Sequence, residues 1–465
     1  MRFETPPADS RRAAITGSML LGDVLGYPLA GIRQGHVQQL AGVVAGPLAD
    51  GNLLTDRPDR YREAGLHSAL GQTALAVAAT AGQDELGRDE VARVASALLE
   101  LAGPDEATPG ALRWPGRPLR AAVKQWREDY PWERGDFLTG RRGSKGASCA
   151  AAALAAAATG WPAGDERTRD LMRLTHHRQL PLAAGFAVAR CAELLLAEAD
   201  GARFDRAALL ERLRSDCAEY ERQLVREYGA GWREAEWEPP ARPFAEALAP
   251  LASLLREGND TLAVNTILGG IGDFGPDSPV THPMHGFAAA CVPWTLYLAL
   301  GERPPGLALE TAVNLGGETA LVCALLAGLL AARYGRALFP EEWWKSVKAL
   351  AEARRLLALP SAENAAAWLD AERSWSAREA ARRAELLKAL PPEKRAPPPR
   401  KRADEAGIEL PPDLAPPPEV WMRDTDEMDP WEKARFKEAR GRRRIGWKEE
   451  RRDRSREGEP FEDED

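Results

Sequence analysis

The sequence predicts an all-α protein, and three observations carry that prediction. Ala, Leu, Arg and Glu dominate the composition while β-branched residues are few, which favours helices over strands. Apolar residues recur at i, i+3 and i+4, and the strict alternation typical of strands is absent. Gly and Pro clusters separate the periodic segments and mark loops. We therefore expect one compact body of antiparallel and crossed helices.

Helical spacing is clearest in three segments of this body. They are Val91 to Leu101, Leu182 to Leu196 and Ala207 to Val225. Loops are expected at Gly103-Pro104 and at Trp114-Pro115-Gly116, because Pro and Gly interrupt helices. The body is expected to cover residues 1–348.

The composition changes after about Ala349, which predicts two further parts. Residues 349–390 have the pattern of a charged helical arm, which Pro360 breaks and in which Ser361 can cap the second half. From Pro391 the chain is rich in Pro and in charges of both signs. Such a segment cannot bury enough apolar area to offset its ordering entropy. Residues 391–465 are therefore expected to form a largely disordered tail.

Charge and cysteine usage narrow the class of protein. The formal net charge is −8, so no global basic field attracts nucleic acid, and a nucleic-acid partner is not expected. The five Cys are scattered without a CxxC pair, which fits a reducing compartment, and we expect a cytoplasmic protein. The first residues, MRFETPPADSRR, lack the apolar core of a signal peptide. The longest apolar runs are shorter than the roughly 20 residues of a membrane span.

Five short motifs follow one another between residues 12 and 340. They are GSMLLGDVLGYPLAG (17–31), SALGQTALAVA (68–78), GSKGA (143–147), LTHH (174–177) and NLGGETALVCALLAG (314–328). In this order they resemble the motifs of the ADP-ribosylglycohydrolase family. The resemblance implies the orthogonal helical bundle of that family for the body of the chain.

The resemblance also implies a site for two divalent cations, usually magnesium, which clamp the ribose hydroxyls of ADP-ribose. Carboxylates from three motifs hold these cations, since hard cations take oxygen ligands. The corresponding positions here are Ala30, Ala69, Leu70, Glu318, Ala320 and Leu321. Only Glu318 among them can bind a cation. The resemblance thus implies a degenerate metal site, and we expect no cofactor and no bound metal.

Other side chains are candidates for ligand binding rather than for metal binding. Asp23 in Gly-Asp-x-x-Gly is expected to accept hydrogen bonds from helix-end or loop amides, with direct ligand contact as the alternative. The loop Gly143-Ser144-Lys145-Gly146 precedes an Ala-rich helix, and such turns can present amides to phosphate. An ordinary loop at a helix start is the alternative. Glu318 completes the candidates, and no residue is assigned a catalytic role.

One further motif, His282-Pro283-Met284-His285, has HxxH spacing. A replacement metal site of both His with Glu318 is disfavoured, because Pro inside the motif departs from the helical spacing that ligands prefer.

Three hypotheses for function follow. The favoured one is an ADP-ribosylglycohydrolase-like pseudoenzyme that binds ADP-ribose or a related nucleotide, or acts as a scaffold. The second is an active magnesium-dependent hydrolase of an ADP-ribosyl or related glycosidic bond. The third is an interaction protein that binds a protein partner through residues 391–465. The fold does not decide among them, because function depends on the site.

Overall fold

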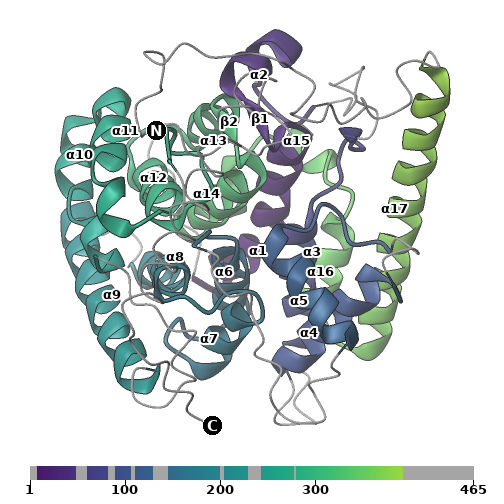
Figure 1. Cartoon of the computed structure of the whole chain (residues 1–465), viewed down its shortest axis with the longest axis horizontal. Helices are drawn as coiled ribbons and strands as arrows, with labels where there is room; N and C mark the ends of the chain where they lie inside the picture. Colours follow the sequence, from purple (N-terminus) through teal and green to yellow (C-terminus); the bar gives the residue numbers. More distant parts are fainter. Residues whose placement is uncertain are drawn as a thin grey trace, which may run out of the picture. The chain divides into compact units, whose positions relative to one another are not determined.

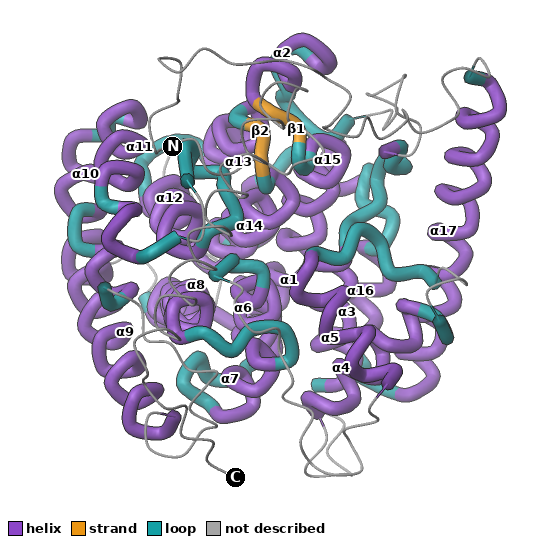
Figure 2. Tube along the Cα trace, in the orientation of Figure 1, coloured by secondary structure: helices purple, strands orange, loops and turns teal. Residues whose placement is uncertain are grey.

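The computed structural model of the chain describes residues 8–48, 60–81, 90–105, 110–128, 145–198, 204–228, 242–276 and 279–390. Within these residues the prediction of an all-α fold is confirmed, and the one sheet has two strands of two residues each (Figures 1 and 2). The described residues up to Pro276 and from Val280 onward belong to one compact unit, which includes residues 349–390. The predicted tail, residues 391–465, lies outside the described residues.

The α-helices run in chain order as follows: α1 (Ala8–Gly26), α2 (Gln34–Ala41), α3 (Ala69–Thr80), α4 (Glu90–Ala102), α5 (Arg117–Glu128), α6 (Cys149–Thr159), α7 (Glu166–Arg173), α8 (Gln179–Ala197), α9 (Arg206–Tyr228), α10 (Leu251–Glu257), α11 (Asp260–Gly269), α12 (Ala288–Leu300), α13 (Pro305–Asn314), α14 (Thr319–Tyr334), α15 (Glu341–Lys345), α16 (Leu350–Ala358) and α17 (Ala362–Ala389). Short 3₁₀ helices are η1 (Tyr27–Leu29), η5 (Phe244–Leu248), η6 (Ile271–Phe274) and η7 (Arg336–Leu338). The three segments with clear helical spacing are α4, α8 and α9.

The central contact of the core is the packing of α1 on α14. Glycines allow it: a Cβ on Gly22 would lie 2.0 Å from the carbonyl oxygen of Cys323, and one on Gly26 would lie 2.3 Å from that of Thr319. Helices α6 and α8 pack beside this pair, and most of their residues are buried too. Helix α8 is long and apolar enough to cross a membrane, but 83% of its apolar stretch is buried inside the unit, as in a core helix.

The small sheet joins strand β1 (Ile32–Arg33) to β2 (Gly316–Gly317) in antiparallel register, with Ile32 opposite Gly317. Both glycines have positive φ, 70° and 78°. A Cβ on Gly316 would lie 2.4 Å from the carbonyl oxygen of Ile32, so the strand approaches too closely for a side chain. Period-2 alternation cannot reveal strands this short, which is why the sequence predicted none. Their pairing brings residue 30 next to residue 318.

The predicted interruption of the charged arm at Pro360 is present, between α16 and α17. The Ser361 side chain accepts a hydrogen bond from the Asn364 amide at 3.2 Å and caps α17. Helix α17 packs against α3 and α4, along one edge of the unit in Figure 1. Its Glu372 is fully buried, where it accepts hydrogen bonds from Arg113 at 2.5 Å and from Gln72 at 2.8 Å. A helix with a polar surface is thus attached to the body through a buried carboxylate.

Candidate functional site

Asp23 connects α1 to the start of α3. Its Oδ2 accepts hydrogen bonds from the Ser68 amide (3.0 Å), the Ser68 hydroxyl (2.9 Å) and the Gly71 amide (2.9 Å). Its Oδ1 is buried and has no hydrogen-bond partner within the described part of the chain. Burial raises the pKa of Asp23, while His67 and the hydrogen bonds from Ser68 and Gly71 oppose that rise. The prediction that Asp23 accepts hydrogen bonds from amides at a helix end is confirmed.

Two further connections bring the other motif segments to the same end of α1. The Thr319 hydroxyl, in the first turn of α14, donates to the carbonyl oxygen of Gly26 at 2.7 Å. The Gly31 amide donates to the carbonyl oxygen of Gly317 at 2.8 Å. The segments around residues 30, 69–70 and 318–321 therefore meet around the last turns of α1.

The side chains at these positions do not fit a pair of divalent cations. Ala30, Ala69, Ala320 and Leu321 are buried, Leu70 is half-buried and Glu318 is exposed. A hard cation needs about six oxygen ligands, which one carboxylate among apolar neighbours cannot supply. Across the described ranges, no group of three or more His, Cys, Asp or Glu side chains is placed to hold a metal ion.

A guanidinium lies beside the first of these positions. Arg62 is 3% exposed, and its Nη1 donates to the carbonyl oxygens of Ala30, at 3.0 Å, and of Tyr27. Burial lowers the pKa of Arg62, whereas Tyr27, Glu379 and Glu318 act in the opposite direction. An arginine stays protonated in proteins, so a fixed positive charge lies next to Ala30. This position of Arg62 could not be predicted from the sequence, because Arg62 follows Arg57 and Arg60 in a segment of similar composition.

The candidate phosphate loop lies against the loop before α12. Gly146 forms a β-bridge with Phe287, and the Ala147 amide donates to the carbonyl oxygen of Gly286 at 2.9 Å. The Lys145 ammonium group donates to the carbonyl oxygen of Gly275, so this cation supports a neighbouring turn. Gly143 and Ser144 lie outside the described residues. Phosphate binding by this loop is still a prediction.

Glu318 lies next to the same loop. Its amide donates to the carbonyl oxygen of Met284 at 2.9 Å, and a Cβ on Gly286 would lie 3.3 Å from its Cγ. The structure thus brings Lys145, Gly146 and Glu318 together around the loop of residues 284–287, while Asp23 is buried at the helix packing.

The histidines have structural partners. The Nδ1 atoms of His282 and His285 accept the amides of Met284 and Phe287, each at 3.1 Å, and burial lowers the pKa of both rings. These contacts hold the loop in place. His176 was not a site candidate in the sequence, yet its Nε2 lies 3.4 Å from the Ser148 hydroxyl at the start of α6, and burial lowers its pKa to about 3. This pair is 28 residues apart in the chain, so no local motif could indicate it.

A family model described as ADP-ribosylglycohydrolase matches residues 5–379. Among solved structures, the chain is similar to one titled "ADP-ribosylglycohydrolase-related protein complex", with 19% sequence identity, a TM-score of 0.47, and coverage of 76% of this chain and 99% of that one. A search of curated proteins found no match. The family match covers most of the sequence, and the chain belongs to the ADP-ribosylglycohydrolase family.

Proposed function

We propose that this protein binds an ADP-ribosyl group without metal and does not cleave it. Membership of the family supports an ADP-ribosylated molecule as the class of ligand. The observation that carries the proposal is the Arg62 guanidinium, which is bonded to the carbonyl oxygen of Ala30 at 3.0 Å. In the family this position holds a carboxylate for a cation. In this chain the position is Ala30, and the positively charged side chain of Arg62 lies beside it.

Loss of hydrolysis follows from what a guanidinium can and cannot do. Divalent cations polarise the glycosidic centre and lower the pKa of a bound water, which makes a nucleophile near neutral pH. A guanidinium has no open coordination position for water, so it cannot generate that nucleophile. It can still donate charge-assisted hydrogen bonds to phosphate or hydroxyl oxygens. Binding is retained in this proposal, and the chemical step is lost.

The test has a turnover arm and a binding arm on the full chain. We expect no release of ADP-ribose from a modified Arg or Ser peptide with magnesium or with EDTA. We expect calorimetry to detect ADP-ribose binding in EDTA, and Arg62→Gln to weaken it. Arg214→Gln is the matched control, because Arg214 lies on the surface of α9, where its side chain forms an ion pair with Glu211. Robust magnesium-dependent turnover, or no binding of ADP-ribose, would overturn the proposal.

A further inference from the structure

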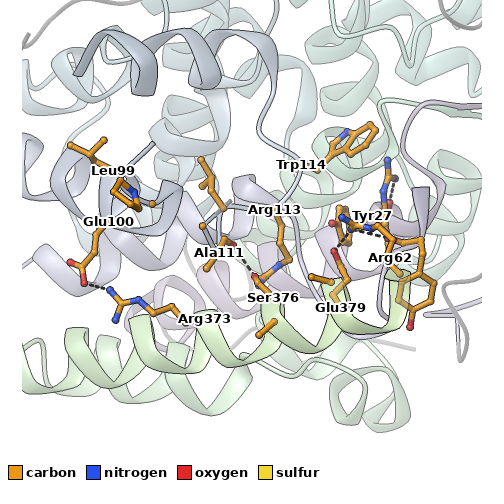
Figure 3. Close-up of a pocket in the computed structure, with 18 of the residues that line it drawn as sticks. Tyr27, Arg62, Leu99, Glu100, Ala111, Arg113, Trp114, Arg373, Ser376 and Glu379 are labelled. Atoms are coloured by element: carbon orange, nitrogen blue, oxygen red, sulfur yellow. Dashed lines mark hydrogen bonds and ion pairs between the residues drawn. The ribbon is translucent and has the colours of Figure 1, made fainter. Parts of the chain in front are cut away.

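A cavity of about 1110 Å³ opens between α4, α5, α17 and the segment of residues 110–114 (Figure 3). Tyr27 and Arg62 lie at one end of it and Glu100 and Arg373 at the other, with Ser376 of α17 between them. Its volume is slightly above the range of about 300–1,000 Å³ that is typical of small-molecule sites. Helix α17 forms a wall of the cavity, so the cavity depends on the docking of that helix.

The charges that line this cavity are mostly positive. They comprise two glutamates, Glu100 and Glu379, and six arginines, Arg60, Arg62, Arg113, Arg127, Arg373 and Arg383. Some of these guanidiniums are paired: Arg113 contacts Glu372, Arg373 contacts Glu100, and Arg383 contacts Glu379. The excess of positive charge still favours an anionic occupant.

Two of the arginines are held by carbonyl groups and not by carboxylates. Arg62 donates to the carbonyl oxygens of Tyr27 and Ala30, and Arg127 donates to those of Ala102 and Gly103. A carbonyl dipole fixes a guanidinium without neutralising it. The Nε of Arg62 is also buried without a hydrogen-bond partner among the described residues. These two positive charges remain available to an anion in the cavity.

Trp114 gives the cavity an aromatic surface. It is the one residue other than glycine with a positive φ, 47°, in the described ranges. Positive φ strains the backbone of a residue other than glycine, and the following Pro115 restricts residue 114 further. The guanidinium of Arg62 lies 4.0 Å from the centre of the Trp114 ring, yet the side chain is 49% exposed. A strained backbone that holds a large ring partly in solvent indicates a role for that ring in binding.

We propose that this cavity is the ligand site of the protein: a flat ring stacks on Trp114, and the anionic groups of the same small molecule face the arginines. The ligand class is a ring-bearing phosphate compound of nucleotide size. Its identification with an ADP-ribosyl group rests on the proposed function. Stacking and charge both act without a metal ion, so EDTA leaves binding unchanged.

The test is to measure by calorimetry, in EDTA, the affinities of the full chain and of two variants for AMP and for ADP-ribose. Trp114→Gly removes the ring and lets the backbone adopt its positive φ without strain. Trp114→Phe keeps a ring at the same place. We expect Trp114→Gly to weaken AMP binding about tenfold or more, from the loss of one stacking contact. Trp114→Phe should stay within a few-fold of the natural chain, and adenosine and inorganic phosphate alone should each bind more weakly than AMP.

Circular dichroism melts separate a binding role from a structural one. We expect Trp114→Gly to melt close to or above the natural chain, because relief of strain offsets the lost contact with Arg62. If the natural chain and Trp114→Gly bind ADP-ribose with equal affinity, the cavity is not the ligand site, and the proposed function is not refuted. AMP binding that depends on Trp114, without any ADP-ribose binding, would support the cavity and refute the proposed function. The absence of saturable AMP binding up to millimolar concentration would overturn the proposal that this cavity is the ligand site.

Discussion

Replacing Glu372 by Gln perturbs the carboxylate that attaches α17 to the body. Its Oε2 accepts from Arg113 at 2.5 Å and from Gln72 at 2.8 Å, and its Oε1 contacts His67 Nε2 at 3.0 Å and Trp368 Nε1 at 3.1 Å. Glutamine has nearly the same shape, but one acceptor becomes an NH₂ group that faces donors. The Arg113 guanidinium also loses its partner charge in a buried place.

The pKa of Glu372 sets the size of the effect. Burial alone would raise this pKa, but His67, Arg113 and the hydrogen bonds lower it from 4.5 to about 2. A pKa that is lower in the folded state stabilises the fold at a pH above 4.5, and this stabilisation is lost as the pH falls toward 2. The difference between the two pKa values corresponds to about 3 kcal/mol, close to the roughly 3–5 kcal/mol for breaking one side of a buried pair.

Urea unfolding of the full chain, followed by far-ultraviolet circular dichroism, measures this effect. At pH 7 we expect Glu372→Gln to lower the free energy of unfolding by about 3 kcal/mol. This difference should shrink as the pH falls from about 5 toward 2, because only the natural chain has a carboxylate at residue 372 that can be protonated. Glu385→Gln is the matched control on the same helix, since the Glu385 side chain is 65% exposed and pairs only with Arg382 in the described structure; we expect a change below about 0.5 kcal/mol. Equal stability of the two variants would refute the role of Glu372 in docking α17.

Other predictions concern glycines and the tail. Gly26→Ala should lower the free energy of unfolding by roughly 1–3 kcal/mol, because its Cβ meets the Thr319 carbonyl. Gly35→Ala in α2 should raise the free energy of unfolding by about 0.5–1 kcal/mol, because its Cβ meets nothing within 4 Å. Urea unfolding compares the two variants, and equal effects would contradict the close packing of α1 on α14. A chain that ends at Leu390 should keep its helicity and melting temperature, because the composition of residues 391–465 lacks the apolar periodicity of a docked domain; unfolding of that truncated chain would show that the tail belongs to the fold.

The fold was predictable because its signals are local. Helical periodicity located α4, α8 and α9, and Pro360 with Ser361 located the gap between α16 and α17. The small sheet was not predictable, since two-residue strands depend on the meeting of segments almost 300 residues apart. Glycine spacing in the motifs reflects close backbone approach, which the structure shows at Gly22 and Gly26.

The candidate site could be predicted only where a motif marked it. The motif positions at Ala30, Ala69 and Glu318 could be named from the sequence, but what surrounds them could not. Arg62 and Glu372 belong to charged segments in which exposed and buried residues have the same composition. Only the three-dimensional packing distinguishes the buried Glu372 from an exposed residue such as Glu385. Whether a charged side chain is buried depends on residues far away in the chain, and the pattern of a single sequence does not show which of these residues it contacts.

We propose that this member of the family binds its ligand without divalent cations. The most direct measurement is a pair of calorimetric titrations of the full chain with ADP-ribose, one in EDTA and one in millimolar magnesium. We predict saturable binding with the same dissociation constant in both, because Arg62 and the other arginines of the cavity supply the positive charge. Binding that appears only with magnesium would contradict the claim and show that cation ligands exist among this chain's residues.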